Sequence, residues 1–295
     1  MPGREFYIVD VFAEKKYAGN QLAVVRDAAD LSVTEMQLIA REMNFKETSF
    51  ILSDRPNQGG YDVRIFTPVG EIPFAGHPAL GTACIIRHEI MERPSDEVIL
   101  NLKVGAISVS FGDVSGMAGY VWMKQHAPVF GREFDRKTLA TALGIADGDV
   151  DERFPAREVS TGTPFIIVPL KSLAAVEKAR IVPEIFEAII EKAEAKAILL
   201  FTTETVDSDN DLHARVFADY YGVPEDPATG SANGCLAGYM IEHRFLGRDT
   251  VDLRVEQGLE IGRPSLIFLK AYKEDQRIEI YVGGRVYMVA RGEMV

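Results

Sequence analysis

The chain has 295 residues, of which 47% are hydrophobic and 26% are charged, a composition typical of a globular protein. Its formal net charge of −12 argues against nucleic acids and anionic membranes as partners, because both would repel it. No apolar run is long enough for a transmembrane helix, no signal peptide is apparent and only two cysteines occur, so we expect a cytoplasmic protein without a disulfide framework.

The first half of the chain alternates between strand-like and helical patterns. Its predicted strands cover residues 5–12, 21–25, 48–52, 61–67, 98–103, 106–112 and 119–125. Ser32 and Glu35 form a capping-box pattern, which predicts a helix that runs to about Asn44. A second helix is expected to open at Pro78 and to continue to about Ile90.

The second half repeats this order of elements. Its predicted strands cover residues 163–170, 197–201, 212–218, 251–257, 265–272, 277–283 and 285–290. One helix is predicted over residues 183–195, and another is expected to open at Pro227 and to end near His243.

A short turn occurs twice in the chain, as HPALGTA at 77–83 and as DPATGSA at 226–232. Similar strands precede the two copies, and ETSFIL further upstream resembles GTPFII, which aligns Glu47 with Gly162. The repeat predicts a duplication: two related α/β domains, each with a mixed sheet around a helix, that face each other across a cleft.

Each copy of the turn places small residues at an expected helix N-terminus. The first N–H groups of a helix have no partner within the helix and lie at the positive end of its dipole, so they can bind an anion. Gly230 and Ser231 are therefore candidates to bind a carboxylate. His77 and Asp226 head the two copies and differ in chemistry, which favours a functional role over simple capping, although Asp is also a common N-cap residue.

Glu47 is the third candidate with an ionisable side chain. It stands at the start of a predicted strand, between Phe45 and Phe50. A carboxylate at the apolar edge of a cleft would have a raised pKa and could act as a general base. The alternative is a solvated glutamate at a strand end.

Other kinds of chemistry find no support in the sequence. The five histidines form no metal-binding pair of the HxxxH type, and neither GxGxxG nor GxxxxGK[ST] is present. Cys84 and Cys235 fall inside predicted helices and are expected to be buried. We therefore expect acid/base chemistry without a metal or another cofactor.

Several motifs together resemble the PhzF-like (phenazine biosynthesis) isomerase family. They are YAGNQLAVV, MNFKETSFI, RIFTPVGEIPFAGHPALGTA, DPATGSANGCLAGYM and EQGLEIGRPS. The resemblance implies an α+β fold similar to diaminopimelate epimerase, with two pseudo-symmetric domains, each a mostly antiparallel β-sheet wrapped around a central helix. It places the domains at residues 1–125, joined by a C-terminal strand at 284–295, and at 126–283, and it suggests a homodimer.

The same resemblance assigns roles to individual residues. It implies Glu47, His77 and Asp226 as catalytic residues, with Gly76, Gly230 and Ser231 binding a small carboxylate substrate. An isomerase of the dihydro-3-hydroxyanthranilate type is therefore expected. Two alternatives remain open, namely an epimerase or racemase of amino or hydroxy acids and a carboxylate-binding protein without turnover.

Overall fold

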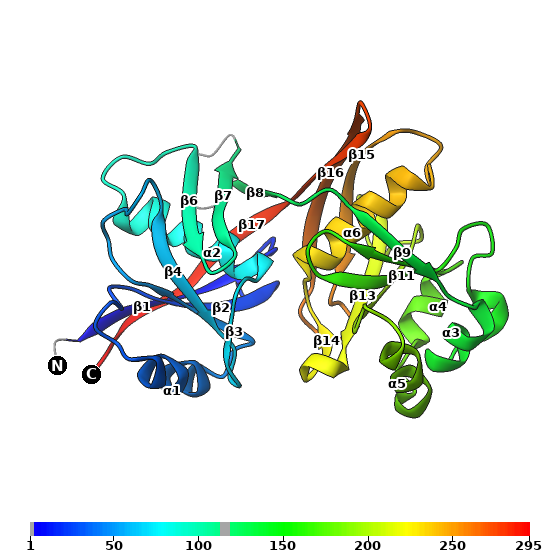
Figure 1. Cartoon of the computed structure of the whole chain (residues 1–295), viewed down its shortest axis with the longest axis horizontal. Coiled ribbons are helices and arrows are strands. Elements are labelled where there is room, and N and C mark those ends of the chain that lie inside the picture. Colours follow the sequence, from blue (N-terminus) through cyan, green and yellow to red (C-terminus); the bar gives the residue numbers. More distant parts are fainter. Residues whose placement is uncertain (1–2, 113–118) are drawn as a thin grey trace. The chain divides into compact units, whose positions relative to one another are not determined.

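The structure, a computed structural model, describes residues 3–112 and 119–295. The chain forms two compact units, one of Met1–Lys124 together with Gly283–Val295 and one of Gln125–Val282. Figure 1 shows the first unit in blue and cyan with a red C-terminal segment, and the second in green to orange. Both units are mixed α/β folds in which strands predominate. No helix of the described residues has the length and apolar character needed to cross a membrane.

The first unit is built on a mixed sheet that closes on itself. Its strands are β1 (Arg4–Val11), β2 (Asn20–Val25), β3 (Glu47–Ile51), β4 (Tyr61–Phe66), β5 (Glu71–Ile72), β6 (Glu97–Leu102), β7 (Gly105–Phe111), β8 (Tyr120–Lys124) and the C-terminal part of β17 (Arg277–Met294). Pairing runs in the order β1, β2, β3, β4, β6, β7, β8, β17 and back to β1, and β2–β3 and β4–β6 are parallel pairs. Closure leaves no sheet edge in this ring open for pairing with another chain.

Helix α2 (Gly76–Ile85) lies among the strands of this ring. It contacts β1, β2, β3, β6, β7 and β8, and all its residues from His77 onwards are buried. Close packing depends on Gly81, because a Cβ there would lie 2.6 Å from Cδ2 of Leu22. A wider π-helical turn (Ile86–Ile90) continues α2 to the residue where the sequence predicted the end of the helix. The absence of a side chain at Gly81 therefore lets branched side chains of β1 and β2 approach the helix backbone.

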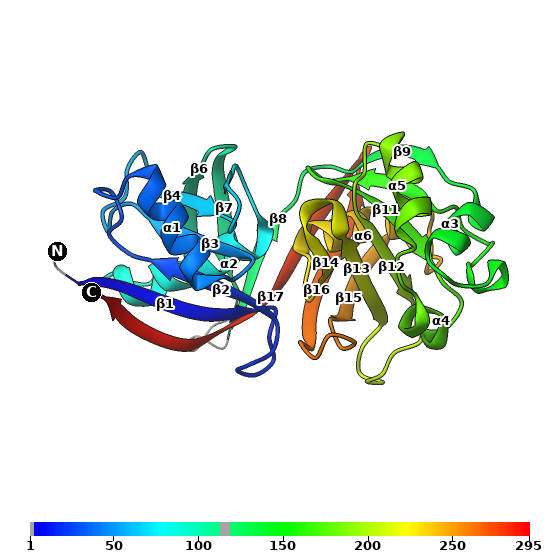
Figure 2. The same cartoon turned by 90° about the horizontal axis from the view of Figure 1, so that it is seen from below.

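Helix α1 (Val33–Met43) packs on the outside of the same sheet (Figure 2). The predicted capping box is present, since Ser32 Oγ accepts a hydrogen bond from the N–H of Glu35 while the Glu35 carboxylate accepts one from the N–H of Ser32. The helix ends at Asn44, which adopts a left-handed backbone conformation with φ of 52°. Its buried side contributes to an apolar cluster with Phe50 and Phe66.

The second unit likewise combines a mixed sheet with a buried helix. Its strands are β9 (Val129–Glu133), β10 (Arg157–Ser160), β11 (Pro164–Pro169), β12 (Ile198–Thr202), β13 (Leu212–Ala218), β14 (Val223–Asp226), β15 (Thr250–Gln257), β16 (Ser265–Glu274) and the first part of β17. The pairs β11–β12 and β13–β15 are parallel, whereas β9–β10, β10–β11, β12–β13 and β15–β16 are antiparallel. Helix α6 (Gly230–Glu242) contacts β10, β11, β15 and β16, and Ala232–Ile241 are buried.

Three further helices belong to the second unit, α3 (Arg136–Ala142), α4 (Leu173–Lys178) and α5 (Pro183–Glu191). They share an apolar core with β11 and β12 that includes Leu139, Val168, Val176, Phe186 and Leu200. Of these helices only α5 was predicted, since α3 and α4 are too short to give a clear helical periodicity.

The helix starts differ from those expected from the two prolines. Helix α2 begins at Gly76, two residues before Pro78, and α6 begins at Gly230, three residues after Pro227. Asp226 still belongs to β14, where it pairs with Val216, so the chain can enter the helix only after the following turn. The N-cap residue of α6 is therefore Thr229 and not Asp226.

A buried ionic network connects β13 to β15 in the second unit. His213 is fully buried. Its Nδ1 lies 2.8 Å from Oε1 of Glu256, and its Nε2 lies 2.8 Å from Oε1 of Glu260. Burial alone would lower the pKa of His213, but hydrogen bonds to both carboxylates outweigh it and raise the pKa to about 9. Burial alone would raise the pKa of Glu256, yet hydrogen bonds from His213, Asn210 and two backbone N–H groups hold it at about 2.

This network makes the stability of the protein dependent on pH. Because folding raises the pKa of His213, the protonated imidazole stabilises the folded state. This contribution is complete below about pH 6.5 and is lost progressively as the pH rises through about 9. His213→Gln should therefore lower the free energy of unfolding by roughly 3 kcal/mol at pH 6, and by much less at pH 10. Urea unfolding at the two pH values measures both differences. The same substitution at the exposed His126 is the control, and an equal loss at both pH values in His213→Gln would contradict a protonated imidazole in this network.

Candidate functional site

Glu47 and His77 come together in the first unit. Glu47 opens strand β3, and His77 is the second residue of α2, beside the partly exposed Gly76. Oε2 of Glu47 lies 3.2 Å from Nε2 of His77, and only 18% and 8% of these side chains are exposed. Glu47 is thus not a solvated residue at a strand end. The structure pairs a largely buried carboxylate with an imidazole at the N-terminus of a buried helix.

Asn20 was not among the predicted site residues, and it contacts the other side of His77. Nδ2 of the buried Asn20 lies 3.3 Å from Nδ1 of His77. Because the amide nitrogen of Asn20 can only donate, Nδ1 accepts, and neutral His77 carries its proton on Nε2, the nitrogen that faces Oε2 of Glu47. The hydrogen bond from Asn20 therefore directs the proton of neutral His77 toward the Glu47 carboxylate.

A glycine determines where Asn20 lies. Gly19 has φ of +70°, and a Cβ there would lie 2.4 Å from the carbonyl oxygen of Val11. Only glycine tolerates both the positive φ and this close approach to the backbone. Gly19 therefore allows the YAGN turn to place Asn20, the first residue of β2, beside α2. A Gly-Asn pair at the start of a strand was the one local signal for this residue, but its contact with His77 spans 57 positions of sequence.

The second unit gathers Asp226, Gly230 and Ser231. Asp226 ends β14, and its Oδ2 accepts a hydrogen bond of 2.5 Å from Oγ1 of Thr229. Gly230 and Ser231 open α6, and the side chain of its N-cap residue Thr229 makes no capping hydrogen bond. Their N–H groups and the helix dipole make this end suitable for an anion, as the sequence suggested.

The predicted residues thus fall into two sets, one in each unit. Glu47, His77 and Gly76 form the first, and Asp226, Gly230 and Ser231 form the second. No group of three or more His, Cys, Asp or Glu side chains in the described part of the chain could hold a metal ion. Cys84 and Cys235 are buried, and burial raises the pKa of each thiol to about 12, so neither is a ready nucleophile.

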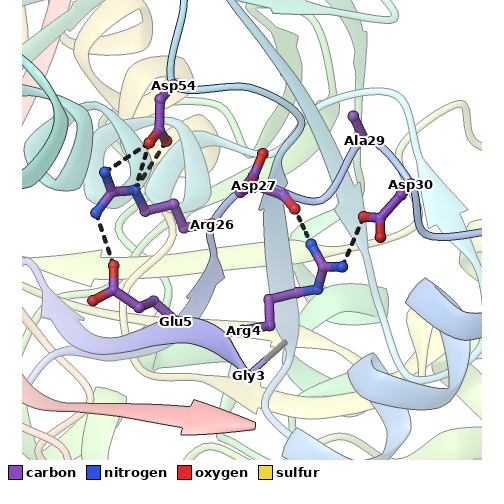
Figure 3. Close-up of a pocket in the computed structure, with 8 residues that line it drawn as sticks. All are labelled: Gly3, Arg4, Glu5, Arg26, Asp27, Ala29, Asp30 and Asp54. Carbon is purple, nitrogen blue, oxygen red and sulfur yellow. Dashed lines mark hydrogen bonds and ion pairs between the residues drawn. The ribbon is translucent and has the colours of Figure 1, made fainter. Parts of the chain in front are cut away.

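A separate pocket lies in the first unit and contains none of these residues (Figure 3). Arg26 in this pocket is 2.6 Å from Asp54 and 2.8 Å from Glu5, and Arg4 is 2.7 Å from Asp30. Both guanidinium groups already neutralise carboxylates of the chain itself. This pocket is therefore a weaker candidate for binding an acidic ligand than either set described above.

Comparison with known proteins identifies relatives that match nearly the whole chain. The family of phenazine biosynthesis-like proteins matches residues 9–292. Trans-2,3-dihydro-3-hydroxyanthranilate isomerase from Pseudomonas chlororaphis is 36% identical to this chain over 296 residues, which cover 98% of this chain and 99% of that protein.

Solved structures share the fold. A phenazine biosynthesis protein of the PhzF family from Bacillus anthracis has a TM-score of 0.89 and 29% identity, with 100% of both chains covered. A predicted epimerase from Pseudomonas aeruginosa has a TM-score of 0.81 and 32% identity, with 99% of both chains covered. A probable proline racemase from Agrobacterium radiobacter, at 10% identity and a TM-score of 0.63 over 99% of this chain and 93% of that one, shares the fold alone.

The direction of the hydrogen bonds around His77 can be tested by ¹⁵N NMR of its ring. In the neutral form of this ring, Nδ1 should be unprotonated and Nε2 protonated, because Asn20 donates to Nδ1. His213 provides a control in the same spectrum, because its pKa of about 9 keeps both ring nitrogens protonated. Asn20→Leu should allow the other tautomer of His77, while a proton on Nδ1 in the unmodified protein would show that the bond with Asn20 runs the opposite way.

Proposed function

The chain belongs to the family of phenazine biosynthesis-like proteins, as its motifs indicated, and we propose that this isomerase moves a proton within a small unsaturated carboxylate of the trans-2,3-dihydro-3-hydroxyanthranilate type. Glu47 would be the general acid and base. The observation that supports this role best is the 3.2 Å contact between the largely buried Glu47 and His77.

In this mechanism the Glu47 carboxylate removes a proton from a carbon next to a π-system of the substrate. The electron pair of the broken C–H bond enters the π-system, and protonated Glu47 then returns the proton to another carbon on the same face. One carboxyl group is therefore base and acid in turn, and no step needs a metal or an organic cofactor. The Nε2–H of His77 would hold one oxygen of Glu47, which leaves the reacting oxygen in a fixed orientation.

The second set has complementary chemistry. The N–H groups of Gly230 and Ser231, at the positive end of α6, would bind the substrate carboxylate and stabilise negative charge that develops on the substrate. Asp226 would orient a hydroxyl or amino group, and the backbone of Gly76 would contribute beside His77. We propose that both sets act on the same substrate molecule, in line with the cleft expected from the duplicated sequence.

The proposal predicts proton exchange that depends on Glu47. The protein, incubated in D₂O with trans-2,3-dihydro-3-hydroxyanthranilate, should place deuterium on one carbon of the product, as followed by ¹H NMR. Glu47→Gln should reduce the rate at least about a hundredfold, because it removes the only proposed proton carrier. Glu42→Gln makes the same change at an exposed position of α1 and should leave the rate unaltered.

The result also separates the alternatives. Exchange that survives Glu47→Gln would assign the base to another residue. Inversion at a single labelled carbon, rather than a shift to a second carbon, would indicate an epimerase or racemase. Binding of the substrate without any exchange would indicate a carboxylate-binding protein.

A further inference from the structure

The buried side-chain amide of Gln257 forms hydrogen bonds to the DPATG turn of the second unit and to the helix that follows it. It is the last residue of β15 and is fully buried. Its Nε2 donates hydrogen bonds to the backbone oxygen of Asp226 (2.7 Å) and to Oγ1 of Thr229 (3.2 Å). Its Oε1 accepts from Nδ2 of Asn233 (2.9 Å) and from the N–H of Thr229 (3.4 Å). One side chain therefore holds the end of β14, the N-cap residue and the first turn of α6.

These contacts also determine that the hydroxyl proton of Thr229 points toward Asp226. The Gln257 amide nitrogen can only donate, so the Thr229 hydroxyl oxygen accepts from it. The single proton of that hydroxyl is then left for Oδ2 of Asp226, at 2.5 Å. The Asp226 carboxylate is thus oriented by Thr229, which is in turn oriented by Gln257.

The backbone that carries Gln257 lies directly against the turn. Gly258 has φ of +77°, and a Cβ there would lie 2.6 Å from the carbonyl oxygen of Pro227. On the strand position before Gln257, Glu256 accepts hydrogen bonds from Asn210 and from the N–H groups of Val206 and Asp207, in addition to its contact with His213. The end of β15 is therefore fixed before any ligand binds.

We propose that Gln257 is a positioning residue of this isomerase, which sets the orientation of the Asp226 carboxylate and of the first N–H groups of α6. This inference rests on the proposed function, in which those groups bind the substrate. The side-chain hydrogen bonds of Gln257 described above go to the turn and the helix, so it acts through Asp226, Thr229 and the N-terminus of α6.

Gln257→Glu tests the proposal with a side chain of the same shape. At pH 8 the introduced carboxylate would face the carbonyl of Asp226 and would compete with the Asp226 carboxylate for the Thr229 proton. We expect kcat/KM for trans-2,3-dihydro-3-hydroxyanthranilate to fall at least about tenfold, through KM and kcat together, because the first N–H groups of α6 would both bind the substrate carboxylate and stabilise the charge that develops on the substrate. Below about pH 6 the introduced carboxyl group would become protonated and donate one of the two hydrogen bonds that Gln257 makes, so activity relative to the unmodified protein should recover in part.

Two further variants make the test specific. Gln37→Glu removes a similar amide-to-carbonyl hydrogen bond, from Gln37 Nε2 to the backbone oxygen of Thr67 (2.9 Å), and should change neither kcat/KM nor its pH profile. Thr229→Val removes the hydroxyl between Gln257 and Asp226. Thr229→Val should reduce kcat/KM as Gln257→Glu does, but its kcat/KM should not recover at low pH. If Gln257→Glu does not fold, Thr229→Val provides the test.

Failure of this inference can be distinguished from failure of the proposed function. Unmodified protein that does not convert the substrate contradicts the proposed function alone, and the amide ¹H–¹⁵N signals of Thr229, Gly230 and Ser231 then decide the role of Gln257. These signals should move in Gln257→Glu at pH 8 and return in part on acidification. Signals that stay in place, or a kcat/KM and pH profile equal to those of the unmodified protein, would overturn the proposal.

Discussion

The burial of nearly every residue of a short helix in each unit is the constraint on which the rest of the structure depends. Helices α2 and α6 contact strands on several sides, so neither can present a polar face to water. Their sequences therefore consist largely of Gly, Ala and other small residues that allow close approach to the sheet. The polar groups that burial cannot remove are the N–H groups of the first turn. Both sets of candidate residues gather at that end, where the N–H groups have no partner within the helix.

The sequence predicted the features that depend on local patterns. Periodicity located most strands and the two central helices, and the repeated turn predicted two related halves. Proline position alone did not predict the helix starts, since Asp226 remains in β14 through its pairing with Val216. Asn20 and Gln257 escaped notice because their roles come from contacts with residues 57 and 31 positions away, which no local motif encodes.

The two units are not equivalent in chemistry, and their backbones show why. The sequence repeat aligns Glu47 with Gly162, which has φ of +138°. A side chain is strained in that conformation, so the second unit could not carry a glutamate at this position without a change in its backbone. In the first unit the same position begins a regular strand, which supports a carboxylate beside His77. The difference between the halves is thus a difference of backbone conformation as well as of residue type.

Strand β17 has a consequence for how the protein is made. Its first residues belong to the second unit, while residues from Gly283 onwards pair with β1 and complete the ring of the first. During synthesis on the ribosome, the first unit therefore cannot complete its sheet until the whole second unit has been translated. Over that interval β1 has an unpaired edge, which is the kind of surface that binds chaperones or aggregates. The unit that begins first along the chain is thus the one that finishes folding last.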